Sequence, residues 1–573
     1  MKRLFLLVLC LILAAGCANV PLESQPVVVS GQRPGQAAGA DAPDPPPGAD
    51  PLDLVRGFVG AAVQPLQNYA AARAYLDDDD RANWKPSPGL TIIQNTFGTV
   101  YDPTPTPDPN TMTVNVRGIM VGQLGPDSAF VPRYESFMQA VKVHRRADGQ
   151  WRIQNAPPDL RVTEDNFAAN FTKVEVNFQA FNTDAFVPDP RYVVAKPQAG
   201  LPSRVMNLLL DGPSAALRGA VKNPLRDSGE AVAVDTNIKS LDDGTLVVPL
   251  TGLTGVVDQV RNMIAAQIVL SLQYVASTRI RILADGAPLL QGQQDFRASE
   301  LPQYGASLSP NSALPGLMTV DGRVRSLGDG ALVPGPAGNG SIKVLSAAQS
   351  VDGKRLAVVE QAGSGVRLRI GDLGHDLTPS IIGSTMSRPT WRPGSGGGEL
   401  WTVLDHNSIA RLVIAGDGKW TPLQVNSADL TALGAVTELR FSRDGSRVAA
   451  VVDGSLVVAS VVASGDSVAL REPRRLQEHD LKEVVDVDWL SQDRLVVSTL
   501  STSQPVVRVE VDGQRMDPYN SSNLTPTVHG VTAAPSRPIV VADDFGLWTA
   551  SELGEVWRPQ LHSAPKADPF YPG

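Results

Sequence analysis

The stretch Leu439-Arg-Phe-Ser-Arg-Asp-Gly-Ser-Arg-Val-Ala-Ala-Val451 decides the fold of the C-terminal half of this 573-residue chain. It joins an aromatic position, a Ser-x-Asp-Gly turn and a run of small apolar residues. Glycine permits the left-handed backbone that a tight turn requires, and a Val/Ala run bounded by turn residues favours a buried strand. The stretch therefore predicts strands connected by a tight turn.

Similar units recur on both sides of this stretch. Equivalent positions, about 44 to 50 residues apart, are held by Trp391, Phe441, Trp489 and Ala533. A four-stranded blade needs about 40–50 residues, and repeats of that period are typical of β-propellers. The repeats predict an all-β propeller over residues 316–563 with five to six blades. We expect residues 316–333 to add strands to the last blade and to close the ring, which removes exposed strand edges.

Residues 170–300 precede the propeller and predict an α+β domain. A strand pattern covers residues 174–181, and Leu209-Leu-Asp-Gly-Pro213 ends a helix, because glycine allows the left-handed cap and proline prevents continuation. Strand patterns follow at 245–250 and 279–283. A long helix is predicted over residues 256–275. Its apolar face comprises Val257, Val260, Ile264, Ile268 and Leu272. The order of these elements resembles the GerMN domain of spore-germination and cell-envelope proteins.

Residues 51–165 predict a further α+β domain in which helices come first and strands follow. Asp50 and Pro51 are typical of a helix start, and Leu54 and Phe58 follow at helical spacing. The run Asp77–Asp80 is interpreted as a solvated helix end, because it lacks the glycine and distal glutamate of a calcium loop. Alternating strand patterns then cover residues 112–117, 137–143 and 151–153. This order resembles the nuclear-transport-factor-2-like (NTF2-like) cone.

The first residues predict export from the cytoplasm. Lys2 and Arg3 precede the apolar stretch Leu4 to Leu13, which is too short to span a membrane and is typical of a signal peptide over residues 1–16. The sequence Leu13-Ala-Ala-Gly-Cys17 resembles the bacterial lipobox. The resemblance implies that Cys17 carries S-diacylglycerol and an N-acyl group such as palmitate. An ordinary secretory signal with a chance cysteine is the alternative.

The other cysteine, Cys10, leaves with the signal peptide, so no disulfide can form within the mature chain. Residues 17–50 are rich in proline, glycine and alanine and predict a disordered tether. Together these features predict a protein anchored by lipid on the outer face of the cytoplasmic membrane, in the cell envelope.

Neither the composition nor the motifs of the chain indicate catalysis. The formal net charge of −9 argues against nucleic acid as a partner. Phosphate loops and nucleophile elbows are absent from the sequence. We therefore expect no catalytic residue, metal or cofactor. The histidines, no two of which have metal-ligand spacing, are His144, His375, His406, His479, His529 and His562.

Two further polar motifs have structural interpretations. Gly465-Asp466-Ser467 resembles the start of a GDS-type hydrolase, but it lies between strand patterns and predicts a hairpin turn. Asp486 and Asp488 flank Val487, and we expect them to form strand-end hydrogen bonds within a blade.

The combined order of segments is similar to that of the LpqB family of actinobacterial lipoproteins, over essentially the whole chain. It comprises the lipobox, the tether, a domain with Trp84-Lys-Pro86 and Gly149-Gln-Trp-Arg-Ile153, the GerMN-like unit and a terminal propeller. The resemblance implies an accessory of the MtrA–MtrB two-component system that acts with the extracellular domain of the sensor kinase MtrB. It also implies effects on cell-wall metabolism and division. Cys17 is the functional residue that the resemblance transfers.

Two alternatives to the signalling role remain open. One is a scaffold that binds a cell-wall ligand. The other is a propeller hydrolase acting on peptidoglycan, which would require a polar funnel lined by close Asp/Glu pairs.

Overall fold

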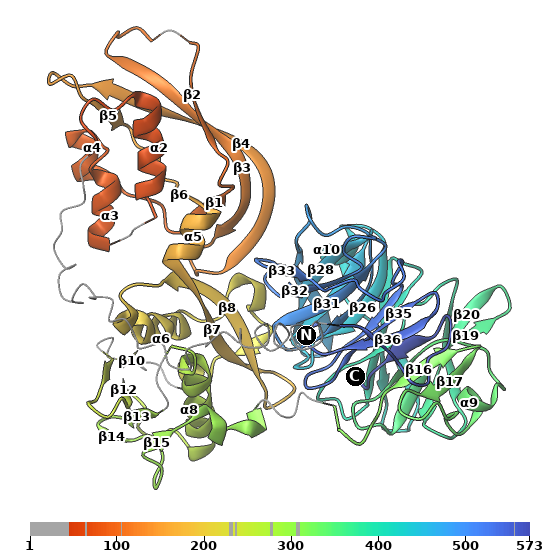
Figure 1. Ribbon diagram of the computed structural model, residues 1–573. Helices are drawn as coiled ribbons and strands as arrows, with labels where there is room; N and C mark the ends of the chain where they lie inside the picture. Colours follow the sequence, from red (N-terminus) through yellow and green to blue (C-terminus); the bar gives the residue numbers. More distant parts are fainter. Residues whose placement is uncertain are drawn as a thin grey trace, which may run out of the picture. The chain divides into compact units, whose positions relative to one another are not determined.

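The computed structural model describes residues 45–63, 66–104, 106–228, 233–234, 238–275, 279–304, 310–554 and 556–573 (Figure 1). The predicted signal peptide, Cys17 and the tether up to residue 44 lie outside these residues. Residues 45–50, which were expected in the tether, belong to the same compact unit as the rest of the described chain. The Gly48 amide donates to Gln150 Oε1 over 2.8 Å, and the Asp50 side chain caps the first helix.

The first domain places its helices before its sheet, as predicted. Figure 1 shows the helices beside the broad face of the sheet, where Leu54 and Phe58 pack against Val114 and Val141. Its elements are α2 (Pro51–Ala61), α3 (Leu66–Arg73), α4 (Asp78–Asn83), β1 (Leu90–Ile93), β2 (Gly98–Tyr101), β3 (Thr111–Leu124), β4 (Phe130–Arg145), β5 (Trp151–Gln154) and β6 (Arg161–Thr163). The strand order is β5-β4-β3-β1-β6, with β2 paired to β3.

The acidic run after the first helices begins a helix instead of ending one. Asp77 is the N-cap of α4, and its side chain accepts from the Asp78 amide. Carboxylates in the first turn of a helix interact favourably with the positive end of the helix dipole. The run therefore lies at a solvated helix end, but at the start of α4 and not at the end of α3.

The middle domain has two sheets and two main helices. Its helices are α5 (Glu164–Asn170), α6 (Leu201–Asp211), α7 (Pro224–Asp227) and α8 (Asp258–Leu272). One sheet has the order β8-β7-β9, formed by β7 (Phe171–Ala180), β8 (Phe186–Val194) and β9 (Val221–Lys222). The other contains β10 (Ala233–Val234), β11 (Lys239–Ser240), β12 (Leu246–Thr251), β13 (Ile280–Ala284), β14 (Ala287–Pro288) and β15 (Asp295–Phe296).

Both main helices of this domain pack as the sequence predicts, with one exception. Gly212 follows α6 with a φ of +96°, which only glycine adopts without strain. Ile264, Ile268 and Leu272 of α8 are fully buried. Val257 was predicted on the same buried face, but it precedes the helix and is 64% exposed, so this prediction is wrong. No helix in the described ranges is long and apolar enough to cross a membrane.

The C-terminal part is a β-propeller, which confirms the predicted fold class. In the described part of the chain its strands form six sheets, here called blades 1 to 6. Blade 1 contains β16 (Leu317–Val320), β17 (Arg323–Ser326) and β38 (Asp568–Phe570); blade 2 contains β18 (Val344–Gln349), β19 (Arg355–Ala362), β20 (Gly365–Asp372) and β21 (Thr378–Gly383); blade 3 contains β22 (Thr390–Trp391), β23 (Glu399–Leu404), β24 (Ser408–Ile414) and β25 (Trp420–Gln424). The short helices α9 (Pro336–Asn339) and α10 (Ala428–Thr431) lie between strands.

The remaining blades complete the ring. Blade 4 contains β26 (Val436–Phe441), β27 (Arg447–Val452), β28 (Ser455–Ser464) and β29 (Ser467–Arg475); blade 5 contains β30 (Val484–Trp489), β31 (Arg494–Thr499), β32 (Val506–Glu510) and β33 (Met516–Pro518); blade 6 contains β34 (Gly530–Thr532), β35 (Ile539–Asp543), β36 (Gly546–Ala550) and β37 (Arg558–Pro559).

The ring closes differently from the expectation. Residues 316–333 do not join the last blade. They form blade 1, whose third strand, β38, comes from the C-terminal end of the chain and pairs antiparallel with β16. The propeller therefore extends beyond the predicted end at residue 563. Pairing the first and last strands in one blade joins the two ends of the ring by backbone hydrogen bonds.

The Ser-x-Asp-Gly turns of blades 2 and 4 are built in the same way. In blade 4 the Ser442 hydroxyl donates to Asp444 Oδ1 over 2.9 Å, the same carboxylate accepts the Ser446 amide, and Ser442 Oγ accepts the Arg447 amide. Ser350 and Asp352 form the equivalent turn in blade 2. In each turn these bonds satisfy the serine hydroxyl and one carboxylate oxygen, while Asp444 Oδ2 has no partner among the described residues.

The recurring tryptophans join neighbouring blades. The indole N–H of Trp391 in blade 3 donates to the Ala348 carbonyl of blade 2 over 3.1 Å. Trp489 in blade 5 donates in the same way to the Arg440 carbonyl of blade 4. Both indoles are fully buried, so each combines a large apolar contact with a satisfied N–H.

The β7–β8 hairpin of the middle domain contacts blade 5 through charged and polar groups. Lys173 Nζ lies 3.4 Å from Asp493 and 3.1 Å from Glu510, and the Tyr192 hydroxyl donates to Asp512 over 2.9 Å. Burial and the nearby Asp493 carboxylate raise the pKa of Glu175, on the same hairpin, to about 7. More carboxylates than cations therefore meet at this contact.

Candidate functional site at the propeller axis

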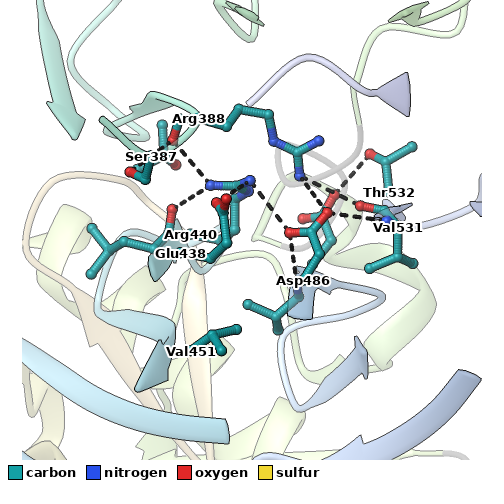
Figure 2. A network of polar contacts seen from close by, with 12 residues as sticks. Ser387, Arg388, Glu438, Arg440, Val451, Asp486, Val531 and Thr532 are labelled. Atoms are coloured by element: carbon teal, nitrogen blue, oxygen red, sulfur yellow. Dashed lines mark hydrogen bonds and ion pairs between the residues drawn. The ribbon is translucent and has the colours of Figure 1, made fainter. Parts of the chain in front are cut away.

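A network of buried charges fills the axis of the propeller (Figure 2). Arg388, at the start of blade 3, donates through Nη1 to the Pro569 carbonyl of blade 1 over 2.8 Å. Its Nη2 lies 3.5 Å from Asp486 Oδ2 in blade 5 and 3.4 Å from the Val531 carbonyl in blade 6. Burial alone would lower the pKa of Arg388, but the Asp486 and Asp568 carboxylates raise it. One guanidinium thus links four blades.

Arg440 and Asp486 extend the network through blades 4 and 5. Arg440 Nη1 donates to the Arg388 carbonyl over 3.1 Å, and its Nη2 lies 2.8 Å from Glu438 and 3.4 Å from Asp486. Asp486 accepts two backbone amides besides these arginines, from Val487 over 2.8 Å and from Val531 over 3.0 Å. Figure 2 shows the Asp486 carboxylate between the two guanidinium groups.

Asp488 of blade 5 and Arg443 of blade 4 make similar contacts to other blades. Asp488 Oδ2 accepts from the Thr532 hydroxyl over 2.8 Å and from the Ala533 amide over 3.0 Å, both in blade 6. Arg443 donates to the Ala533 carbonyl over 2.8 Å and to the Pro572 carbonyl over 2.6 Å. The expectation that Asp486 and Asp488 bond within one blade is therefore incomplete, because each also holds blade 6.

Glu438 and Asp568 are the carboxylates at the more open end of the network. Burial, together with the Asp486 carboxylate, raises the pKa of Glu438 to about 7 against the opposing effect of Arg440. Burial likewise raises the pKa of Asp568, against the effect of Arg388. The carboxylates of Glu438, Asp486 and Asp568 thus lie close together, which is the feature that the hydrolase alternative required. An arginine contacts each of them.

Little space remains inside the axis. The cavity that Arg388, Arg440 and Asp488 line has a volume of about 20 Å³, enough for about one water molecule, and Phe570 and Tyr571 form part of its wall. At this cavity the side chains leave little room, and the arginine contacts join the blades to one another.

A larger cavity of about 420 Å³ lies on one face of the ring. Trp391 and Phe441 line it together with Arg443, which connects it to the axis. The loop between β22 and β23, Gly394-Ser-Gly-Gly-Gly398, forms another wall, and residues 183–184 of the middle domain lie opposite. Its volume falls in the range of small-molecule sites.

The histidines noted in the sequence are not brought together into a site. His144 lies 3.4 Å from Asp77, His406 contacts the Val436 carbonyl, and His479 stacks on Tyr134. Among the described residues no group of three His, Cys, Asp or Glu side chains is placed to hold a metal ion. Gly465 and Asp466 form the hairpin turn between β28 and β29. Cys17 lies outside the described residues.

The fold and the axis define the class of protein. It is a multidomain β-propeller protein in which two α+β domains precede a ring closed by the last strand and held by a central arginine–aspartate network.

Comparisons with known proteins identify the family. The model of the "Lipoprotein LpqB, N-terminal domain" matches residues 44–168, and that of the "Lipoprotein LpqB beta-propeller domain" matches residues 322–572. Lipoprotein LpqB of Rhodococcus opacus is 31% identical over 98% of this chain and 96% of its own length. Lipoprotein LpqB of Mycobacterium tuberculosis is 28% identical over the whole of both chains. The chain belongs to the LpqB family of lipoproteins, which confirms the resemblance noted in the sequence.

Proposed function

We propose that this protein is an accessory of a two-component system of the MtrA–MtrB type. In this proposal it is held on the outer face of the cytoplasmic membrane by lipid on Cys17. It binds the extracellular domain of the sensor kinase, and through the kinase it affects cell-wall metabolism and division. Membership of a lipoprotein family and the lipobox-like sequence before Cys17 support the anchor.

Exposed apolar side chains on blade 6 carry the proposal of a protein partner. Leu561 and Phe545 are 87% and 70% exposed, whereas the exposed Leu553 and Val556 lie in the loop between β36 and β37, at the other end of that strand pair. Phe545 and Leu561 lie at the same end of the blade, because the Gln560 amide donates to the Leu547 carbonyl. Apolar side chains that gather on a surface mark interaction sites more often than single exposed ones.

The anchor is tested by replacing Cys17 with alanine. The variant lacks the thiol that accepts diacylglycerol, and without acyl chains the protein loses its hydrophobic attachment to the bilayer. We expect it to move from the membrane fraction to the soluble fraction and its mass to show no lipid. An unchanged membrane fraction with an unchanged mass would contradict lipidation at Cys17.

The partner surface is tested with Phe545→Ser combined with Leu561→Ser. If blade 6 docks on the kinase, loss of two apolar contacts is expected to weaken binding at least tenfold. The measurement is biolayer interferometry of the Cys17→Ala chain on the immobilised extracellular domain of the kinase. The matched control is Ile382→Ser, because Ile382 is 65% exposed on blade 2. Equal binding by the double variant and the parent protein would exclude this surface.

The cavity on the face of the ring favours a second function, a scaffold that binds a cell-wall ligand. A sugar that carries a carboxylate suits this cavity, because the Arg443 guanidinium lies in its wall. We expect the Cys17→Ala chain to remain on isolated cell wall, and Arg443→Gln to be retained less, if this function holds. Complete release of the unlipidated chain from the wall would exclude it.

A further inference from the structure

A largely apolar cavity of about 330 Å³ lies between the first domain and the middle domain, and no residue of the propeller lines it. The first domain contributes Val63, Leu124 and Leu160, which are buried, and the middle domain contributes Phe171 and Val193. The volume is at the lower end of the range for small-molecule sites, which occur preferentially between domains. Ser128 and Asn207 also line the cavity, but most of its lining is apolar and accepts a hydrocarbon chain.

A single cation lies at this cavity. Arg204, on α6, lines it and donates to the Val194 and Pro197 carbonyls through Nη1 and to the Lys196 carbonyl through Nη2, at 2.8, 3.3 and 3.2 Å. No carboxylate of the described residues lies within 4 Å of this guanidinium. Three carbonyls use only part of its five N–H donors and do not neutralise its charge. Arg204 is partly buried, and this burial lowers its pKa.

A second polar group lines the same cavity. The Tyr69 ring packs edge-on against Trp84 at 6.0 Å between centroids, and its hydroxyl makes no hydrogen bond to any described residue. A buried or half-buried hydroxyl favours a partner. The cavity therefore combines an apolar interior with an unneutralised cation and a free donor, a combination that suits an anion attached to a hydrocarbon chain.

We propose that this cavity binds a free fatty carboxylate, with its chain among the apolar side chains and its carboxylate on Arg204. Arg204 supplies the charge, since guanidinium–carboxylate hydrogen bonds are about twice as strong as neutral ones. The hydrocarbon chain supplies affinity by removing apolar surface from water. The proposal concerns a site separate from both the propeller axis and the exposed surface of blade 6.

The test is equilibrium dialysis of radiolabelled dodecanoate, below its micelle-forming concentration, against the Cys17→Ala chain. We expect saturable binding of one dodecanoate per chain. Arg204→Gln is expected to weaken it at least tenfold, and Leu90→Trp, which places an indole in the cavity, to abolish it. Arg218→Gln is the matched control, because Arg218 is an exposed arginine of the same domain. Circular dichroism and thermal melting establish that each variant is folded.

Several results would overturn the proposal. Folded parent protein that retains no dodecanoate would exclude the ligand class. Dodecanoate bound equally by the parent protein, Arg204→Gln and Leu90→Trp would place the binding elsewhere. Dodecanol bound as tightly as dodecanoate would show that the carboxylate makes no contribution and that Arg204 is not its partner.

Discussion

Replacing Asp486 with alanine is expected to lower the free energy of unfolding of the propeller by about 3–5 kcal/mol. The Asp486 carboxylate lies between Arg388 and Arg440 and accepts the Val531 amide of blade 6. Its removal leaves two buried guanidinium groups without this partner, and the cost of an unpaired buried charge exceeds that of a lost surface contact. At roughly 2–4 °C per kcal/mol for a domain of this size, the melting temperature should fall by roughly 6–20 °C.

Differential scanning calorimetry of the Cys17→Ala chain and of the same chain with Asp486→Ala measures this effect. Asp466→Ala is the matched control, because Asp466 lies exposed in the β28–β29 turn of the neighbouring blade. The control should melt within a degree or two of its parent. If both aspartate variants shift the melting temperature equally, the axis network does not stabilise the ring.

The second large effect depends on pH and concerns Glu175. Burial and the Asp493 carboxylate raise the pKa of Glu175 from about 4.5 to about 7 in the folded protein. The folded state therefore binds more protons than the unfolded state between these values, and this group makes stability fall as the pH rises from about 4.5 to 7. Glu175→Gln removes the charge and should stabilise the protein by about 2–3 kcal/mol above pH 7.

Urea unfolding at pH 5 and pH 8 tests the sign of this effect. The gain from Glu175→Gln should be present at pH 8 and small at pH 5, where the carboxyl is protonated in the folded state. Glu135→Gln serves as the control, because the Glu135 side chain is about half exposed. A variant that is less stable than its parent at pH 8 would show that Lys173 pairs with Glu175 and that the charged form is favoured.

The blades could be predicted from the sequence because their signals are local. The Ser-x-Asp-Gly turns occupy a few consecutive residues, and the same hydrogen bonds recur around Asp352 and Asp444. The tryptophans mark positions that recur with the period of a blade. The start of α2 after Asp50 and the end of α6 before Gly212 could be predicted in the same way, from their capping residues.

The closure of the ring could not be predicted because its signal is not local. The strand β38 has three residues, Asp568-Pro-Phe570, and lacks the alternation that indicates a strand. It pairs with residues near the start of the propeller, at the other end of the C-terminal part of the sequence. The strand propensity of residues 568–570 does not indicate that they pair with β16.

The axis network was missed for a related reason. Arginines such as Arg388 and Arg440 are usually exposed, so a sequence gives no reason to bury them. Their burial becomes favourable because carboxylates and carbonyls from other blades meet at the centre of the ring. Val257 is the opposite case, an apolar residue that is exposed. Its spacing fits the apolar face of α8, but the helix begins one residue later.

Photo-cross-linking in intact cells tests whether blade 6 contacts the sensor kinase. A benzoyl-phenylalanine placed at Leu561 of blade 6 should form an adduct with the extracellular domain of the sensor kinase, and the same probe at Ile382 should not. Mass spectrometry of the adduct identifies the partner. Efficient cross-linking from Leu561 to other proteins or to the cell wall, with no kinase adduct, would contradict the proposed role in signalling.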